Sequence, residues 1–297
     1  MICPYPVSIV NPLADVDGFS RMYVGCTKCG ACLSNRRSEW SFRIKQEAKH
    51  SETAYFITLT YHNSTVPFTD NGLLNLNKRD VQLFNKSLRK EQAKFTDQPL
   101  RYFCVGEYGS KFHRPHYHLI YFNLIPSLAD AGKLTLLWWR GIVHIYPLDK
   151  GLTHYTTKYH VTAQKKQRII SHEDDRLDEF TMSSNKPLEG ETIGGIGYQY
   201  IRTHKKYHLS TGNAFVRNNG YIQRMPRYYY RHIFKDLPEN EKERLRQEAV
   251  ALVQRSEDKE LKRLAELGYA KPKHEYLRRL AAEAKNVKFK AKKKGIF

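Results

Sequence analysis

The sequence predicts an α+β fold, because segments with strand character are separated by helices without the regular repeat of a parallel βαβ protein. Hydrophobic residues make up 40% of the 297 residues, which is enough for the core of one large domain or two smaller ones. Four segments combine β-branched and aromatic residues in the way that is typical of strands: residues 54–62, 101–107, 116–122 and 141–146.

The predicted helices follow from apolar residues that recur on one face. Trp40, Ile44 and Ala48 fall four apart, and basic residues occupy the positions between them. This spacing predicts a helix over residues 34–50. The same argument predicts further helices over residues 77–95, 126–140 and 154–164.

Composition changes along the chain and suggests three parts. Residues 1–35 contain cysteines, prolines and glycines and are predicted to be irregular. Residues 36–235 form the main domain, in which the charged polar stretch 165–190 is interpreted as an insertion or a mobile loop. Residues 236–297 are predicted to be a helical, basic tail, because leucines recur at helical spacing and six lysines lie within residues 285–294.

The charge of the chain points to a polyanionic partner. Lysine and arginine exceed aspartate and glutamate by enough to give a net charge of +20, which favours nucleic acid. A membrane partner is not expected, since no stretch of about 18 apolar residues is present. Met1 is not followed by the pattern of a secretory signal, so we expect the protein to act in a cytoplasm. Basic and aromatic residues alternate over residues 198–231, which predicts a surface for single-stranded nucleic acid.

Three of the five cysteines form a C-x-x-C-x-x-C run. Cys26, Cys29 and Cys32, with Cys3 as a fourth ligand, could hold a structural zinc ion. A typical zinc motif has two separated C-x-x-C pairs, so a turn with free or buried thiols is the alternative interpretation. A disulfide framework is not expected in a reducing cytoplasm.

Two histidines at the start of an apolar strand are candidate metal ligands. Side chains alternate along a strand, so His116 and His118 share one face with Cα atoms roughly 7 Å apart. If the two neighbouring strands pair antiparallel, Glu107 approaches the histidines as a third ligand. Two imidazoles and one carboxylate suit Mg²⁺ or Mn²⁺ acting on a phosphate, and they would also accept Zn²⁺. The alternative is that both histidines are ordinary strand residues.

Two tyrosines are candidate nucleophiles. Tyr155 and Tyr159 stand four apart and would share one face of a helix, with Lys158 nearby. A phenol has a pKa near 10, so attack on a phosphate needs help from a cation or a metal. The alternative interpretation is packing, which is the usual role of tyrosines at this spacing.

Taken together, these segments resemble the HUH endonuclease superfamily, and in particular the rolling-circle replication initiators of small single-stranded-DNA phages of the Microviridae, gokushovirus branch. The resemblance covers roughly residues 1–235. It includes the cysteine run with Arg36, Arg37 and Trp40. The other matching segments are residues 56–61, 106–109, 114–118, 155–159, 195–197 and 226–229.

The resemblance implies an antiparallel central sheet flanked by helices. It also implies an enzyme that nicks and rejoins one DNA strand at the phage origin, through a 5′-phosphotyrosine link made by Tyr155 or Tyr159. Glu107, His116 and His118 would bind Mg²⁺ or Mn²⁺, and Lys158 would neutralise charge beside the phosphate. The expected partners are single-stranded origin DNA and a host helicase and DNA polymerase, in the cytoplasm of a bacterial host. The arginines predicted to bind DNA are Arg114, Arg202, Arg224 and Arg227.

Some features leave the prediction open. Members of the superfamily often carry a lysine three residues after the second tyrosine, where this chain has Thr162. The order in which the tyrosines act is therefore not predicted. No phosphate-binding G-x-x-x-x-G-K-[ST] loop is present, which is why strand separation is assigned to a host helicase. The alternative functions are a plasmid relaxase or single-strand transposase of the same superfamily, or a non-catalytic nucleic-acid-binding protein.

Overall fold

The computed structural model of the chain describes residues 3–10, 20–109, 111–148, 174–187, 190–218, 221–273, 275, 276 and 279. Two compact units share these residues. One unit comprises the chain up to Glu39 together with the segment that begins at Tyr200, and the other comprises Trp40–Gln199. The units thus divide the chain near residues 39 and 199, whereas composition alone places boundaries at 35 and 235.

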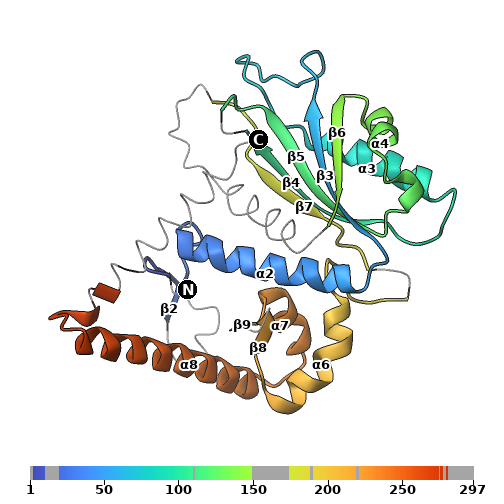
Figure 1. Cartoon of the computed structure of the whole chain (residues 1–297). Helices are drawn as coiled ribbons and strands as arrows, with labels where there is room; N and C mark the ends of the chain where they lie inside the picture. The colour runs from blue at the N-terminus through green and yellow to red at the C-terminus, as the bar shows by residue number, and fades with distance from the viewer. Residues whose placement is uncertain are drawn as a thin grey trace. The chain divides into compact units, whose positions relative to one another are not determined.

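The Trp40–Gln199 unit is built on a five-stranded sheet (Figure 1). Every pairing in the sheet is antiparallel, and the order is β6-β3-β5-β4-β7. The predicted α+β fold with an antiparallel central sheet is therefore confirmed. The strands are β3 (Ala54–Tyr61), β4 (Arg101–Tyr108), β5 (Pro115–Phe122), β6 (Gly141–Pro147) and β7 (Phe180–Ser183).

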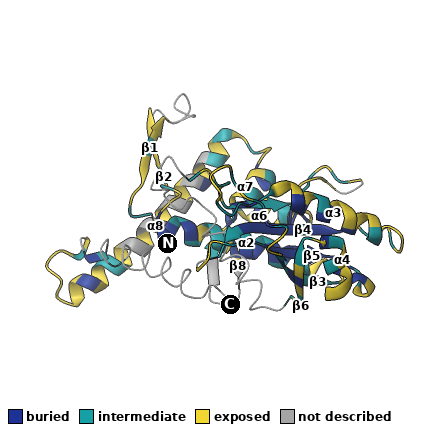
Figure 2. Ribbon diagram, turned by 90° about the horizontal axis from the view of Figure 1, so that it is seen from above, coloured by how far each residue is buried: buried dark blue, intermediate teal, exposed yellow. Residues whose placement is uncertain are grey.

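One face of the sheet is covered by α3 (Lys78–Gln92) and α4 (Ala131–Trp138), with a short 3₁₀ turn at Pro126–Leu128 before α4. Asn77 caps α3 by accepting a hydrogen bond from the Arg79 amide. Figure 2 shows the central strands coloured as buried. The core on this face includes residues from the strands and both helices, among them Leu59, Val81, Phe84, Tyr117, Leu119 and Trp138.

The opposite face carries a second apolar cluster, formed with the last turns of α2 (Gly30–Lys49). Ile44 is fully buried against this cluster, and Trp40 and Ala48 pack at its edge, as their spacing predicted. The Trp40 and Phe103 ring centroids lie 4.7 Å apart. On strands β3, β4 and β5, the same face carries Phe56, Phe103, Val105, Ile120 and Phe122.

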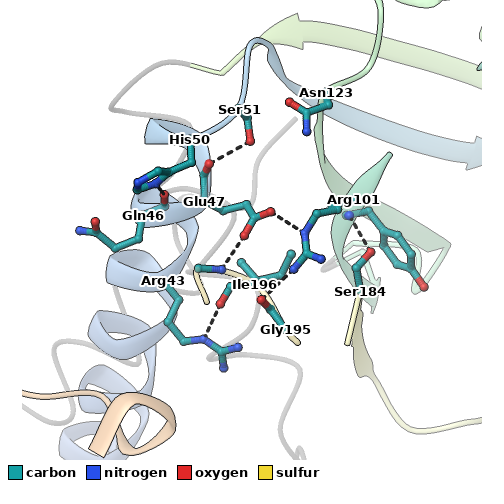
Figure 3. A network of polar contacts seen from close by, with 12 residues as sticks. Arg43, Gln46, Glu47, His50, Ser51, Arg101, Asn123, Ser184, Gly195 and Ile196 are labelled. Atoms are coloured by element: carbon teal, nitrogen blue, oxygen red, sulfur yellow. Dashed lines mark hydrogen bonds and ion pairs between the residues drawn. The ribbon is translucent and has the colours of Figure 1, made fainter. Parts of the chain in front are cut away.

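A buried ion pair ties α2 to the sheet (Figure 3). Arg101 Nε donates to Glu47 Oε1 at 2.5 Å, and the two side chains are 3% and 1% exposed. The Gly197 amide donates to the other Glu47 oxygen at 2.6 Å, and Arg101 Nη2 donates to the Gly195 carbonyl at 2.7 Å. Because each charge meets both its partner and backbone groups, the Gly-Ile-Gly turn is fixed against the sheet.

Two sequence predictions need correction. The stretch 165–190 was interpreted as an insertion or loop, yet residues 180–183 within it form β7, which pairs with β4 at the edge of the sheet. Residues 1–35 were predicted to be irregular, yet β1 (Val7–Val10) and β2 (Arg21–Val24) pair antiparallel. Moreover, α2 begins at Gly30 rather than at residue 34.

The other unit contains three further helices and a small two-stranded sheet. Tyr200 and Tyr229 are buried with their ring centroids 4.8 Å apart, so part of the predicted basic-aromatic surface is core. The helical tail is confirmed by α8, in which Leu245 and Leu264 are buried. The elements are α6 (Gln199–Thr211), β8 (Phe215–Asn218), β9 (Tyr221–Arg224), α7 (Arg227–Ile233) and α8 (Glu239–Glu266).

Among the helices that the structure describes, none combines the length and the apolar character needed to cross a bilayer.

Candidate active site

The predicted metal ligands lie on neighbouring strands at one end of the face that α2 covers at its other end. In the sheet register, Glu107 of β4 pairs with His116 of β5. His118 follows two residues later on the same face, as the strand alternation predicted. The expected approach of the carboxylate to the histidine pair is confirmed, whereas metal binding by these residues stays a prediction.

Glu107 contacts one histidine directly. Its Oε1 lies 3.2 Å from His118 Nε2, and the two side chains are 12% and 9% exposed. The His116 and His118 ring centroids are 6.5 Å apart. The three groups therefore gather within one small region, which is largely shielded from water.

Two threonine hydroxyls orient the imidazoles, and sequence reasoning missed them. Thr58 Oγ1 lies 3.1 Å from His118 Nδ1, and Thr60 Oγ1 lies 3.3 Å from His116 Nδ1. Both threonines come from β3, where they pair across the sheet with His118 and His116 respectively. If each Nδ1–H donates to its hydroxyl, each Nε2 keeps a lone pair for a ligand. The alternation of strand 54–62 placed both threonines on one face, but only the register shows which histidine each one meets.

Neighbouring side chains hold the rings in place. The Phe56 ring stacks on His118 with centroids 5.7 Å apart and planes inclined by 11°. A Cβ atom added at Gly109 would lie 3.3 Å from His116 Nε2, so the glycine leaves room for that ring. Burial lowers the pKa of His116 to about 4, with smaller contributions from the charges of His118 and Arg114. His116 is therefore neutral at physiological pH, as a metal ligand must be.

The donor set of this site fits a divalent ion that prefers nitrogen and oxygen ligands. Neutral imidazole nitrogens beside a carboxylate are ligands for Mn²⁺ and, with water, for Mg²⁺. The three groups do not, however, form a closed cage. Within the described residues, the cysteine cluster is what meets the stricter condition of three or more ligand atoms within 4.8 Å of one another.

That cluster consists of Cys3, Cys26, Cys29 and Cys32, which the sequence singled out for zinc. All four are free thiols, and Cys29 is buried. Burial raises the pKa of Cys29 and Cys32 above the ordinary value. For Cys26 burial acts in the same direction, but hydrogen bonds from the amides of Lys28 and Cys29 outweigh it and bring its pKa down to about 7.

The remaining predicted site residues are not all brought together. Tyr155, Lys158 and Tyr159, with the helix predicted over residues 154–164, lie outside the described residues. Arg114 precedes β5, and its guanidinium donates to Asn63 Oδ1 at 2.8 Å and to the Tyr61 carbonyl. Arg202, Arg224 and Arg227 are exposed and belong to the other compact unit. DNA binding by these arginines stays a prediction.

Comparison with known proteins identifies the family of the unit that carries the site. A family model of the phage replication-associated protein ORF2 matches residues 54–167, which include β3, β4, β5 and β6. Residues 54–167 thus belong to this family. The resemblance to replication-associated proteins of small phages, predicted from the sequence, is confirmed.

Three curated relatives extend the similarity beyond the matched region. Replication-associated protein ORF2 of Spiroplasma virus 4 is 26% identical over 232 residues, which cover 72% of this chain and 68% of the relative. Replication-associated protein VP4 of Bdellovibrio phage phiMH2K is 27% identical over 231 residues, with the same coverage. Replication-associated protein ORF4 of Chlamydia phage 1 is 26% identical over 245 residues, covering 75% of this chain and 56% of the relative. No solved structure matches the chain.

Proposed function

We propose that this chain is a phage replication initiator that nicks and rejoins one strand of DNA at the replication origin. The relatives are replication-associated proteins of phages, and the net charge of +20 suits a DNA partner. The observation that carries the proposal is the contact of Glu107 with His118 in a register that sets His116 beside the same carboxylate.

The reaction would be a phosphoryl transfer to tyrosine. The oxygen of Tyr155 or Tyr159 attacks the phosphorus of a backbone phosphodiester and loses its proton. The bond from phosphorus to the 3′ oxygen breaks, and that oxygen takes up a proton to become a free hydroxyl. One phosphodiester is exchanged for one phosphotyrosine ester, so the same bonds can be exchanged back when the strand is rejoined.

The residues of the sheet would prepare the phosphate for this attack. Glu107, His116 and His118 would hold Mg²⁺ or Mn²⁺, which when bound draws negative charge from the phosphate oxygens. Thr58 and Thr60 keep the two rings oriented through their Nδ1 atoms. Lys158 would lie beside the reacting phosphate and offset its charge.

The products of nicking define the partners. The free 3′-hydroxyl would prime a host DNA polymerase while a host helicase separates the strands, in the bacterial cytoplasm. After one circuit, the second tyrosine would cut the regenerated origin, and the first cut end would be joined into a circle. This division of labour needs two tyrosines, which is why the pair Tyr155 and Tyr159 is central to the proposal.

A covalent adduct is the decisive observation. The purified chain is incubated with Mn²⁺ and the circular single-stranded genome of the phage, so that the origin is present whatever its sequence. After nuclease digestion, we expect a protein band that carries DNA on a denaturing gel. The double variant Tyr155→Phe, Tyr159→Phe should form no adduct. Tyr23→Phe, which removes a phenol from a residue that is 75% exposed on β2, is the matched control and should form as much adduct as the parent.

The same assay separates the alternatives. A non-catalytic nucleic-acid-binding protein would retard the DNA without any adduct, and this result would overturn the proposal. Adducts that survive in the double variant would refute the assignment of the nucleophiles. Adducts on unrelated plasmid or transposon strands, but not on the phage genome, would favour a relaxase or transposase instead.

A further inference from the structure

The N-terminal cysteines come together from three places in the chain. Cys3 precedes β1, Cys26 follows β2, and Cys29 and Cys32 lie at the start of α2. Their four sulfur atoms all lie within 4.8 Å of one another. The β1–β2 hairpin and the first turn of α2 thus converge on one point, and a cluster of this kind needs an explanation beyond packing.

The spacing of the sulfurs excludes a disulfide and fits a tetrahedral ion. Cys3 Sγ and Cys29 Sγ are 3.7 Å apart. A disulfide requires about 2.05 Å between sulfurs, whereas four sulfurs placed at about 2.3 Å around a tetrahedral zinc ion are about 3.8 Å apart. The observed distance is therefore that of two ligands on one ion.

The backbone donates hydrogen bonds to the sulfurs in a consistent pattern. The amide of Cys26 donates to Cys3 Sγ at 3.3 Å, that of Cys29 donates to Cys26 Sγ at 3.3 Å, and that of Cys32 donates to Cys29 Sγ at 3.4 Å. An N–H group that points at sulfur favours the thiolate, which is the form that binds metal. Three successive donors therefore prepare the cluster for ligation.

The local backbone also adapts to the cluster. Thr27 has a φ of +61°, a left-handed conformation that a β-branched residue rarely adopts. This turn brings the Cys26 and Cys29 sulfurs to the same side of the chain. A Cβ atom at Gly25 would lie 3.0 Å from Cys32 Sγ, so only glycine leaves that sulfur its place. The chain accepts an unfavourable conformation and a glycine here, and metal ligation gives both a reason.

Charge completes the argument. Several thiolates this close repel one another unless a cation lies between them. The guanidinium of Arg36 interacts electrostatically with Cys32, and its Nη1 is buried and has no hydrogen-bond partner among the described residues. A divalent ion with four thiolates carries a net charge of about −2, which a neighbouring guanidinium would offset.

We propose that Cys3, Cys26, Cys29 and Cys32 bind one structural zinc ion that fastens the β1–β2 hairpin to the start of α2. Four protein ligands leave no open position, so the ion has no part in the chemistry of the histidine site. Zinc is favoured over harder ions because all four ligands are sulfur. The proposal stands independently of the nicking activity, since no residue is shared between the two sites.

The test is the metal content of the full-length chain, purified without chelators and measured by plasma mass spectrometry. We expect one zinc per chain, and the variant Cys26→Ser, Cys32→Ser should lose it. Cys104→Ala is the matched control, because Cys104 is fully buried in the sheet outside the cluster, and this variant should keep the zinc. The variant His116→Ala, His118→Ala should also keep it, and this separates the cysteine cluster from the histidine site.

A second measurement does not depend on the folding of any variant. A mercurial that binds thiols is added stepwise to the parent protein while a zinc-sensitive dye reports release. Release of one zinc with about four equivalents of mercurial supports the proposal. Three results would overturn it: less than half an equivalent of zinc in the parent, zinc that is lost with the histidines instead of the cysteines, or iron in place of zinc.

Discussion

Thr58 Oγ1 lies 3.1 Å from His118 Nδ1, across the boundary between β3 and β5. Thr60 bears the same relation to His116 two residues further along the strand, at 3.3 Å. A strand without predicted site residues therefore sets the orientation of both candidate ligands. Partners of this kind fix the tautomer of a histidine and the direction of its free nitrogen.

Replacing Thr58 with valine keeps the shape of the side chain and removes the hydroxyl. We expect the affinity for Mn²⁺ to fall by roughly 10- to 100-fold, the range typical when the partner of a ligating histidine is lost. Nicking should fall with it and should recover at higher Mn²⁺ concentration. Binding measured by titration calorimetry, beside the adduct assay, would check both parts.

The matched control for this change is Thr181→Val, on strand β7 of the same sheet, where the register pairs Thr181 with Val105. The control should bind Mn²⁺ as the parent does. Equal losses in both variants would mean that the Thr58 hydroxyl supports the sheet rather than His118.

Much of the sheet could be predicted from the sequence, since β3, β4, β5 and β6 carry β-branched and aromatic residues in clear runs. β7 could not, because its four residues stand within a long polar stretch and gain their place only by pairing with β4. Its Phe180 ring packs over Gly106, where a Cβ atom would lie 2.8 Å from the ring. Such a contact between distant segments leaves no local pattern.

The site shows the same division. The spacing of His116 and His118 predicted a shared face, and the short loop after β4 suggested that Glu107 would approach them. The role of Thr58 depends on the register of β3 against β5, which the sequence does not specify. Likewise, Cys3 reaches the other cysteines only because the β1–β2 hairpin returns the chain to them.

Glu107→Gln tests the carboxylate with almost no change of shape. The amide lacks the negative charge that attracts a divalent ion, so we expect the affinity for Mn²⁺ to fall by about tenfold or more. Manganese electron paramagnetic resonance, which reports free Mn²⁺ directly, is a suitable measurement. The variant should melt near the temperature of the parent, since a neutral amide still hydrogen-bonds to His118.

For Glu107→Gln, the comparison is Glu91→Gln on the surface of α3, where the glutamate pairs with the exposed Lys94. That pair contributes little to stability or to the site. If Glu107→Gln bound Mn²⁺ as tightly as Glu91→Gln, the carboxylate would not be a ligand.

Arg101→Met tests the buried ion pair that anchors the Gly-Ile-Gly turn. The change leaves the Glu47 carboxylate buried with the Gly197 amide as its remaining partner in the network of Figure 3. Breaking one side of a buried pair costs about 3–5 kcal/mol, so the thermal unfolding midpoint should fall by many degrees. Lys90→Met, an exposed change on α3, should hardly alter the midpoint in calorimetry.

Replacing both charges together sharpens this test. The double variant Glu47→Leu, Arg101→Met removes the uncompensated charge, so it should be more stable than Arg101→Met alone. A double variant that unfolded at a lower temperature than the single one would show that the turn depends on the charges themselves.

The pKa of His116 makes the stability of the chain depend on pH in a defined window. Burial lowers this pKa to about 4, whereas a histidine in the unfolded chain has a pKa near 6.5. Between these values the unfolded chain binds more protons than the folded one, so stability decreases as the pH falls from about 6.5 toward 4. The slope for this one group is at most about 1.4 kcal/mol per pH unit.

Denaturant unfolding without added Mn²⁺ at several pH values measures this slope. His116→Gln should flatten the profile, because glutamine has no proton to take up in this range. His144→Gln, at an exposed position of β6, should leave the profile as it is in the parent. Equal slopes for the parent and His116→Gln would mean that His116 titrates alike in the folded and unfolded states.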